Sequence, residues 1–342
     1  MKKQITCLVL ALLLFLTGCA PAAQEQSKQY TATFLDLFDT VTTVVGVTED
    51  KATFEAQAAA IRDALKRYHQ LFDIYHEYDG IQNLKTVNDR AGQSPVQVDP
   101  EIIRLLKDCK EYYTLTGGRV NVAMGSVLQL WHEARNDSIN DPSSAYLPDM
   151  QELQEAAKHT GMDAVIIDEA AGTVYISDPL TRLDVGAIAK GWAAQQVAKT
   201  APSGYLLSVG GNVCATGPKK ADGTPWVIGV TDPKDPSKNI HTIYVTGGNV
   251  VTSGDYQRSF TVNGKAYHHI IDPDTLMPSE YWSSVTIVCE DSGLADALST
   301  ALFLLPLEEG KALVEKLSAQ ALWIDAAGNE HMTPGFQANL RT

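Results

Sequence analysis

Tyr205-Leu206-Leu207-Ser208-Val209 begins the stretch of the chain that decides the fold. Similar short runs of β-branched and aromatic residues recur after it, and such runs between turn residues are typical of strands. They lie at residues 226–230, 240–245, 250–253, 259–262 and 284–288. The regular strand–helix alternation of a doubly wound sheet is missing. The sequence therefore predicts an α+β fold with mixed or largely antiparallel sheets and flanking helices.

The remaining segments predict the elements around these strands. Residues 31–47 are rich in β-branched residues and predict a strand pair or a bent strand. A hairpin is expected at 164–167 and 173–176, a partly extended segment at 120–131 and a surface loop at 137–148. Apolar residues at helical spacing predict helices, and Asp99 followed by Pro100 marks the start of one. These helices cover residues 53–72, 100–115, 150–159, 187–199 and 293–305. No repeat is visible, and we assign residues 31–342 to a single domain.

The N-terminus has the pattern of an export signal. Two lysines precede an apolar run at residues 7–16, and Leu16-Thr17-Gly18-Cys19 follows directly. This pattern defines a signal peptide, and the run is too short to remain as a membrane span. The box resembles a bacterial lipobox, in which Cys19 becomes the acylated first residue; the alternative is an ordinary signal peptide with a chance cysteine.

We therefore predict a lipoprotein signal peptide at 1–18 and a lipidated Cys19 with a flexible tether at 19–30. The domain is expected on the outer face of the cytoplasmic membrane, which is periplasmic in a Gram-negative cell.

The composition is acidic. The formal net charge is −14, and loss of Lys2 and Lys3 with the signal leaves 25 basic and 41 acidic residues, a net charge of −16. Such a surface disfavours nucleic acid as a partner. An anionic substrate must therefore be held by local groups. The cysteines beyond the signal region form no metal or redox motif and predict buried apolar side chains: Cys109, Cys214 and Cys289.

The segment Leu183-Asp184-Val185-Gly186-Ala187-Ile188-Ala189-Lys190-Gly191-Trp192 predicts a strand, a glycine turn and a helix start. Free N–H groups at a helix start suit phosphate, and Lys190 could add a charge to a pyrophosphate. Asp184 could accept hydrogen bonds from the ligand. In the alternative, Asp184 caps the helix and Lys190 is a solvated surface residue.

Residues 251–258 and 267–273 carry an arginine, paired histidines and an aspartate near strand ends. Neighbours on a strand point to opposite faces, so only one of His268 and His269 is expected to face a site. A neutral imidazole there could take a hydroxyl proton. A zinc site is not expected, because no third His or Cys lies nearby.

Asp296 and Thr300 lie four residues apart in an otherwise apolar helix, which places them on one face. A buried carboxylate is costly unless it is paired or metal-bound, and two hard oxygens suit Mg²⁺ or Ca²⁺. In the alternative, Asp296 complements the helix dipole and Thr300 bonds back to its own helix.

Five segments together resemble the ApbE family of FAD:protein FMN transferases. They are LDVGAIAKGW at 183–192, SVGGNV at 208–213, VTSGDYQR at 251–258, HHIIDP at 268–273 and ADALSTAL at 295–302. They occur in the family's order, over nearly the whole chain beyond the signal. The resemblance implies a single ApbE-like domain related to the T-fold, with FAD as substrate and Mg²⁺ as cofactor.

The resemblance also implies roles for particular residues. Metal ligands would be Asp296, Thr300 and the main-chain carbonyl of Ala187. Contacts to the nucleotide are implied for Asp184, Lys190 and Ile270, and His269 resembles the family's base. Packing against the flavin and adenine is implied for Phe38, Tyr75, Ala123 and Met124. Two residues depart from the family: Leu276 stands where a glycine is usual, and Asn121 where an acidic residue is common.

The implied reaction transfers FMN to a Ser or Thr hydroxyl of a target protein through a phosphoester bond and releases AMP. The implied acceptors are electron-transport subunits with FMN-binding domains, which carry the motif Asp-x-x-[Ser/Thr]-Gly-Ala-[Ser/Thr]. Two alternatives remain open. One is a Mg²⁺-dependent FAD pyrophosphatase that gives FMN and AMP, and the other is a non-catalytic flavin- or solute-binding lipoprotein.

Overall fold

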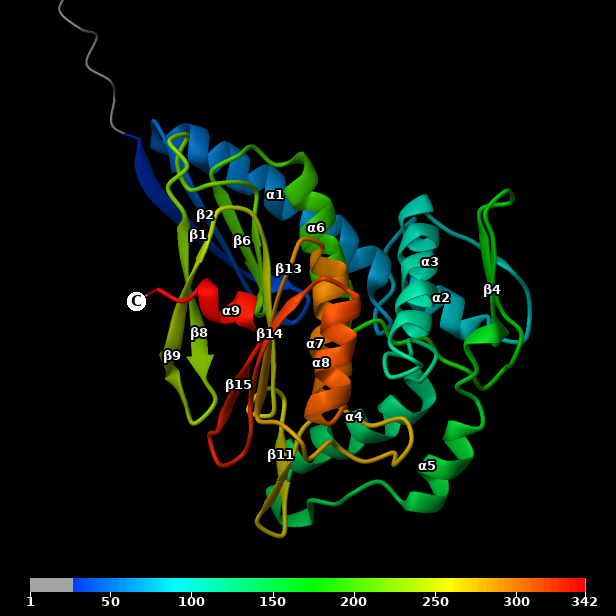
Figure 1. The fold of residues 1–342 in the computed structure, drawn as a ribbon. Coiled ribbons are helices and arrows are strands. Elements are labelled where there is room, and N and C mark those ends of the chain that lie inside the picture. The colour runs from blue at the N-terminus through cyan, green and yellow to red at the C-terminus, as the bar shows by residue number, and fades with distance from the viewer. Residues whose placement is uncertain (1–26, 342) are drawn as a thin grey trace, which may run out of the picture.

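An eight-stranded antiparallel sheet forms the centre of the molecule (Figure 1). The structure is a computed structural model and describes residues 27–341. The strand order is β1-β2-β6-β7-β10-β13-β14-β15, and each neighbouring pair is antiparallel. Its strands are β1 Lys28–Leu37, β2 Thr40–Thr48, β6 Tyr205–Val209, β7 Asn212–Ala215, β10 Gly248–Gly254, β13 Ser284–Cys289, β14 Gln320–Ile324 and β15 Glu330–Met332. The α+β prediction with largely antiparallel sheets is confirmed.

Two short hairpin turns lie next to each other at one end of this sheet. Phe38 and Asp39 connect β1 to β2 with φ of 52° and 50°, and Gly210 and Gly211 connect β6 to β7 with φ of 55° and 93°. Positive φ at both central residues is the geometry that matches the twist of a two-residue hairpin. Gly210 N–H donates to Val41 O at 3.1 Å, which ties the two turns together.

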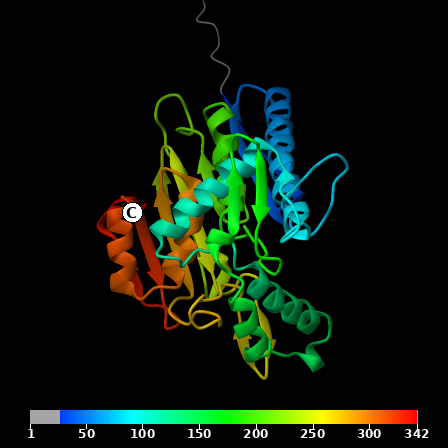
Figure 2. The same cartoon turned by 90° about the vertical axis from the view of Figure 1, so that its right-hand side faces the viewer.

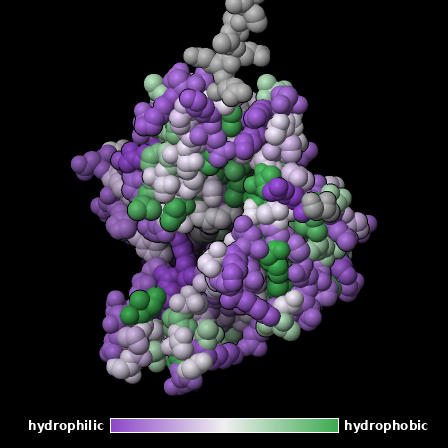
Figure 3. Space-filling view, turned by 90° about the vertical axis from the view of Figure 1, so that its left-hand side faces the viewer, coloured by the Kyte–Doolittle hydropathy of each residue, from purple (hydrophilic) through white to green (hydrophobic). Residues whose placement is uncertain are grey.

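Helices α1 Lys51–Phe72, α6 Ala189–Thr200 and α7 Ser292–Phe303 cover one face of the sheet (Figure 1). On the opposite face, the hairpin of β8 Trp226–Asp232 and β9 Asp235–Val245 packs with α9 Pro334–Ala338 through Trp226, Ile228 and Phe336. Helix α8 Leu307–Lys316 follows α7 and packs near β14. Hydrophilic residues cover most of the surface seen in Figure 3, in keeping with the acidic composition.

A second group of elements lies beside and below the sheet. It contains α2 Leu84–Asp89, α3 Pro100–Leu115 and a three-stranded sheet of β3 Val96–Gln97, β4 Val165–Asp168 and β5 Thr173–Ile176. Helices α4 Gly125–Asn140 and α5 Met150–Ala157 pack with β11 Phe260–Val262 and β12 Lys265–Tyr267 at the lower end (Figure 2). Short 3₁₀ turns occur at Pro142–Ser144 and Met162–Ala164.

Most predicted elements are confirmed within a few residues, and one region is wrong. Residues 120–131, expected to be partly extended, contain the start of α4, and this helix continues into the expected loop at 137–148. The helical spacing of Val127, Trp131 and Ala134 explains the difference, because these three side chains are buried together in the lower core. Strand β7 was also not expected as a separate element.

The signal peptide, Cys19 and most of the predicted tether lie outside the described residues. Strand β1 begins at Lys28 and pairs with β2 from there, so residues 28–30 of the predicted 19–30 tether belong to the sheet. Within residues 27–341, no helix combines the length and the apolar character needed to cross a bilayer.

Candidate active site

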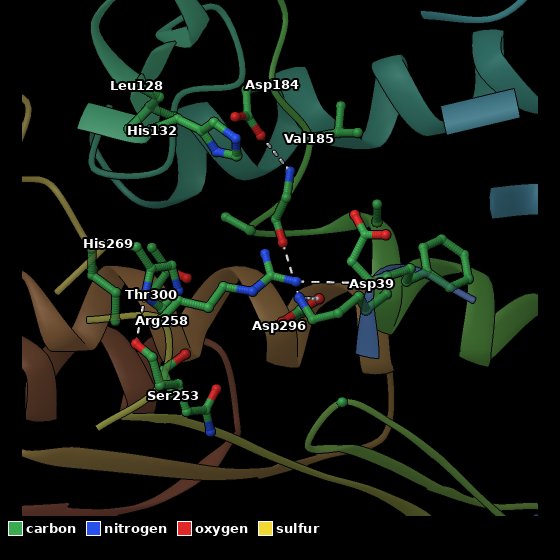
Figure 4. Close-up of a pocket in the computed structure, with 18 of the residues that line it drawn as sticks. Asp39, Leu128, His132, Asp184, Val185, Ser253, Arg258, His269, Asp296 and Thr300 are labelled. Carbon is green, nitrogen blue, oxygen red and sulfur yellow. Dashed lines mark hydrogen bonds and ion pairs between the residues drawn. The ribbon is translucent and has the colours of Figure 1, made fainter. Parts of the chain in front are cut away.

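A cleft opens between the two hairpin turns, α4, the start of α6 and α7 (Figure 4). Nearly all residues predicted for the site line this cleft: Phe38, Tyr75, Met124, Asp184, Ala187, Lys190, His269, Ile270, Asp296 and Thr300. Ala123 does not line it. Its side chain is fully buried in the core, while the flanking Val122 and Met124 reach the cleft. Cys19 lies outside the described residues.

Asp296 is buried on α7 and lies against the start of α6 at Gly191. Its Oδ2 accepts the Gly191 N–H at 2.9 Å and lies 3.6 Å from Lys190 Nζ. Burial raises the pKa of Asp296, and Lys190 and the Gly191 N–H oppose this shift. One of the N–H groups that the sequence suggested for phosphate is therefore used by Asp296.

The close approach of α6 and α7 requires glycine at position 191. A methyl group there would lie 2.3 Å from Ser292 O and 2.6 Å from Asp296 Cβ, well inside van der Waals contact. The glycine in the LDVGAIAKGW segment thus allows the two helices to bring Lys190 and Asp296 together.

The alternative in which Asp184 caps the helix is wrong, because α6 begins at Ala189 and its N-cap residue, Ile188, has no side-chain cap. Asp184 Oδ1 accepts the Gly186 N–H at 2.8 Å, so the carboxylate caps the turn, yet the side chain still faces the cleft (Figure 4). Lys190 is not a solvated surface residue. Its Nζ donates to Gly186 O at 2.9 Å and its side chain is only 20 % exposed.

The oxygen donors around Asp296 fit a hard divalent cation. Within residues 27–341 no three side chains of His, Cys, Asp or Glu gather at one point. The donor set is therefore one carboxylate, the Thr300 hydroxyl and main-chain or amide oxygens, which is the kind of set that Mg²⁺ or Ca²⁺ accepts. Asn212 Oδ1 is a further candidate metal ligand, because this oxygen is buried in the cleft wall without a hydrogen-bond partner.

The two histidines differ in what their nitrogens contact. His268 is buried, its Nε2 donates to Ser279 O at 2.7 Å and its Nδ1 accepts the Ile270 N–H at 3.2 Å. His269 is exposed to the cleft, and only its Nδ1 is bonded, to Gln257 O at 3.2 Å. The prediction that only one histidine faces the site, because neighbours on a strand point to opposite faces, was wrong. Both residues follow β12 in irregular backbone, and both line the cleft.

His269 is held in its neutral form. The cleft walls restrict the water around the ring, and Arg258 and Lys190 add positive charge, so the pKa of His269 is lowered from the ordinary 6.5. With Nδ1–H donating to Gln257 O, Nε2 is the nitrogen that can accept a proton.

Four basic side chains and four aspartates line the cleft: Arg119, Arg135, Lys190 and Arg258 with Asp39, Asp73, Asp184 and Asp296. Arg119 and Lys190 lie within 4.0 Å of carboxylates. Within the described chain, neither Arg135 on α4 nor Arg258 has a carboxylate within 4.0 Å. Burial and the charge of Arg258 lower the pKa of Arg135, so the two arginines repel each other without a ligand. This arrangement suits an anionic ligand. Sequence reasoning missed Arg135 and its neighbour His132, because both stand among several other polar residues of α4 and belong to no motif.

The turn at Leu276 keeps the geometry of a glycine. Leu276 has φ of 60°, its N–H donates to Asp272 O at 2.8 Å, and its carbonyl accepts Trp131 Nε1–H at 3.0 Å. Asp272 Oδ1 also accepts the Asp274 N–H at 2.7 Å. The departure from the family pattern therefore leaves the turn in place.

The sheet topology and the cleft define an α+β protein with a site for an anionic ligand, and comparison with known proteins identifies its family. The profile of the ApbE family matches residues 38–323, and the chain belongs to this family. Two relatives are named FAD:protein FMN transferase. The one from Klebsiella pneumoniae is 31 % identical over 77 % of this chain and 79 % of its own length, and the one from Treponema pallidum is 34 % identical over 70 % of each.

Solved structures show the same fold. The crystal structure of the ApbE protein from Thermotoga maritima has a TM-score of 0.80 at 31 % identity, covering 92 % of this chain and all of that one. The flavin transferase ApbE from Vibrio cholerae has a TM-score of 0.74 at 23 % identity and again covers 92 % of this chain and all of that one.

Proposed function

We propose that this protein is an FAD:protein FMN transferase that moves the FMN part of FAD onto a Ser or Thr hydroxyl of a target protein. Its family and the names of its relatives support flavin transfer. The observation that carries the proposal is the cleft itself, where a proton-accepting His269, unpaired arginines and the buried Asp296 share one opening.

The two arginines without a carboxylate partner in the described chain, Arg135 and Arg258, would bind the pyrophosphate of FAD. Within the described chain, Arg258 and Arg135 form no salt bridge within 4.0 Å, and Lys190 lines the cleft at 3.6 Å from Asp296. The aromatic residues Phe38 and Tyr75 would pack against the ring systems. Positioning and charge stabilisation are the main contributions that phosphoryl transfer requires from a protein.

Asp296, Thr300, the Ala187 carbonyl and Asn212 Oδ1 would hold Mg²⁺. When bound, a divalent cation neutralises charge on the phosphate oxygens. Asp296 contributes the negative charge, and the Gly191 N–H keeps its Oδ2 oriented.

His269 would act as the base. Nε2 takes the proton of the acceptor hydroxyl, and the oxygen forms a bond to the FMN-side phosphorus of FAD. The bond from that phosphorus to the bridging oxygen breaks, and AMP leaves with the bridging oxygen. FMN remains on the acceptor through a phosphoester.

We also propose that Cys19 carries lipid and holds the domain at the outer face of the cytoplasmic membrane. The lipobox sequence supports this part of the proposal. The acceptors would then be extracytoplasmic flavoprotein subunits of electron transport.

Intact-mass analysis tests the transferase proposal. The protein is incubated with FAD, Mg²⁺ and an acceptor domain carrying the motif Asp-x-x-[Ser/Thr]-Gly-Ala-[Ser/Thr], with an acceptor that has Ala in place of the modified residue as control. We expect one FMN added to the first acceptor only and AMP in equal amount. FMN and AMP in solution with both acceptors unmodified would identify a pyrophosphatase, and no turnover of FAD would identify a binding protein.

A further inference from the structure

The end of α1 and the loop after it contain a set of hydrogen bonds that we call the His69 network (His69, Asp73 and Tyr78). His69 and Asp73 themselves line the cleft, whereas Tyr78 is not among its lining residues. The Phe38 N–H donates to His69 Nδ1 at 3.2 Å, and His69 Nε2 lies 3.2 Å from Tyr78 Oη. Tyr78 Oη in turn donates to Asp73 Oδ2 at 2.7 Å. None of these three residues belongs to the motifs that define the family resemblance.

The donors and acceptors fix the direction of this network. Because Nδ1 accepts the Phe38 N–H, the ring proton of neutral His69 is on Nε2 and points to Tyr78. The Tyr78 hydroxyl is then free to donate to Asp73. Burial would raise the pKa of Asp73, but hydrogen bonds from Tyr78, the Tyr75 N–H and His76 hold it below its ordinary value. The network therefore ends on an ionised carboxylate.

One end of the network holds the turn between β1 and β2. Phe38 and Asp39 both have positive φ, which non-glycine residues rarely adopt, and both line the cleft. The Phe38 N–H points to His69, and the Phe38 carbonyl lies 3.5 Å from Arg258 Nη2 on the other side. The ring of Phe38 also meets the ring of His69 edge to face, with centroids 5.6 Å apart.

The other end of the network holds Tyr75. Asp73 Oδ1 accepts the N–H groups of Tyr75 at 2.7 Å and of His76 at 3.1 Å. The Tyr75 ring then stacks on His132 of α4, with centroids 5.2 Å apart. Asp73 and His69 thus hold the backbone at Tyr75 and Phe38, two of the aromatic residues that line the cleft.

We propose that His69 is a positioning residue for the flavin substrate: through Nδ1 it holds the Phe38–Asp39 turn in the left-handed conformation that forms this wall of the cleft. This inference rests on the proposed function, in which Phe38 and Tyr75 contact FAD. Loss of the acceptor leaves the Phe38 N–H unpaired in a partly buried turn, which favours other turn conformations. FAD then binds to a smaller population of competent molecules, and its apparent affinity falls by that fraction.

Two substitutions separate the two nitrogens of His69. In His69→Asn the amide oxygen occupies the place of Nδ1 and can still accept the Phe38 N–H. In His69→Gln the amide reaches the place of Nε2 and leaves Phe38 without an acceptor. The dissociation constant of FAD, measured by quenching of flavin fluorescence, is compared with KM and kcat for each variant. His159→Gln serves as a matched control, because His159 pairs with Asp178 and does not line the cleft.

We expect His69→Gln to weaken FAD binding and raise KM by roughly tenfold, the usual effect of one lost hydrogen bond, with a smaller change in kcat. His69→Asn should recover most of the affinity. Tyr78→Phe, which removes only the hydroxyl, provides a second variant if His69→Gln does not fold, and it should weaken FAD binding by a few-fold.

Equal FAD affinity in wild type, His69→Gln and Tyr78→Phe would overturn the inference. Equal losses in His69→Asn and His69→Gln would also overturn it, because ring packing rather than the hydrogen bond would then be responsible. If no acceptor is flavinylated by the wild type but FAD binding still separates His69→Asn from His69→Gln, the transferase proposal fails and the role of His69 in flavin binding stands.

Discussion

At the scale of single residues, the cleft contains charges that the fold compensates only in part. Asp296 is 4 % exposed, and its polar neighbours are Lys190, the Gly191 main-chain N–H and the Asn212 side chain. A buried carboxylate with few partners is costly for folding. The proposed cation would complete this compensation, so that one side chain would both lower the stability of the metal-free fold and bind the metal.

Asp296→Asn should therefore separate stability from metal binding. The raised pKa means that the carboxyl favours folding below its unfolded pKa and loses this advantage as the pH rises through the folded pKa. At pH 7 without metal, the melting temperature of the variant should equal or exceed that of wild type. Each kcal/mol gained in the free energy of unfolding should raise the melting temperature by about 2 °C. Wild type at 100 times the dissociation constant of Mg²⁺ should gain ~2.7 kcal/mol, and the variant should gain none.

Thermal unfolding with and without Mg²⁺ measures both effects, with the exposed Asp63→Asn on α1 as control. A Mg²⁺-dependent rise in the melting temperature of Asp296→Asn equal to that of wild type would exclude Asp296 as a ligand.

The pH dependence of kcat/KM should report on His269. Its lowered pKa keeps Nε2 unprotonated over a wider pH range than an ordinary histidine would allow. The pH dependence of kcat/KM reports the pKa values of the free enzyme. The acid limb of the kcat/KM profile should therefore lie below pH 6.5, and kcat/KM should be constant from there to neutral pH. His269→Ala should lose ~10²–10⁴-fold in kcat and lose this limb. An acid limb above 6.5, or near-normal turnover by His269→Ala, would contradict the role of His269 as base.

The residues of the site were predictable to different degrees. Asp296 and Thr300 could be placed on one helix face from their spacing alone. Asp184 and Lys190 were candidates from the pattern of a strand, a turn and a helix start, and the resemblance selected His269 from the two histidines. Arg135 could not be found, because only the packing of α4 beside the cleft gives that residue its place. The same applies to Asn212, whose unpaired Oδ1 depends on strands that are far apart in sequence.

At the scale of elements, the site depends on two contacts between segments. The first is the approach of α6 to α7 at Gly191. The second joins α4 to the turn at Leu276, which follows the histidines, because Trp131 Nε1–H donates to the Leu276 carbonyl. At Gly191 the neighbouring helix leaves no space for a side chain. At Leu276 the positive φ favours glycine, but a buried leucine occupies the position.

Gly191→Ala should disturb the first contact. Alanine favours a helix by ~1 kcal/mol over glycine, but here its methyl group would overlap Ser292 O and Asp296 Cβ. Overpacking of this kind costs about 1–3 kcal/mol, so the net change should be destabilising, with weaker Mg²⁺ affinity because Asp296 moves. Gly310→Ala on α8 is the control, since its methyl would meet only side-chain atoms at 3.3 Å or more. Urea unfolding measures the change in stability, and Mg²⁺ titration measures the change in affinity. A Gly191→Ala variant as stable as wild type would show that the two helices can move apart at no cost.

Leu276→Gly tests the second contact, and two effects oppose each other. Glycine would remove the strain of positive φ, which is about 1–2 kcal/mol. It would also remove a leucine side chain that is 7 % exposed in the core shared with Trp131 and Phe260, at a cost of roughly 3–5 kcal/mol. The variant should therefore be less stable by about 1–4 kcal/mol in chemical unfolding. A more stable variant would mean that the strain of the turn exceeds the contribution of packing.

The elements themselves were mostly predictable, because local patterns specify them. The strand pair at β1 and β2, the cap and proline that start α3, and the apolar helix α7 each follow from a short stretch of sequence. The strand order could not be predicted, since β10 pairs with β7 and β13 through contacts between distant segments. Strand β7 was missed because it is four residues long and follows a Gly-Gly turn.

At the scale of the whole molecule, the start of the described chain and the cleft lie at opposite ends of one strand, and the proposed membrane anchor would precede that start. Strand β1 begins at Lys28, and its last residue, Leu37, precedes the Phe38–Asp39 turn that lines the cleft. Ten residues of strand span about 30 Å. In Figure 1 the chain enters β1 at the end of the sheet away from β11 and α4. A tether leaving at Lys28 would therefore not block the cleft, and an acidic domain has no affinity of its own for anionic lipid.

Removing residues 1–26 should consequently separate location from activity. The shortened protein should remain in the soluble fraction, bind FAD as the full chain does, and modify a soluble acceptor with kcat/KM within about twofold, because every predicted cleft residue lies beyond β1 residue Leu37. In the full chain, Cys19→Ala should abolish labelling by a palmitate analogue and release the protein from the membrane fraction. Membrane retention with unchanged labelling in Cys19→Ala would exclude Cys19 as the anchor. Loss of FAD binding on truncation would mean that the segment before β1 contributes to the cleft.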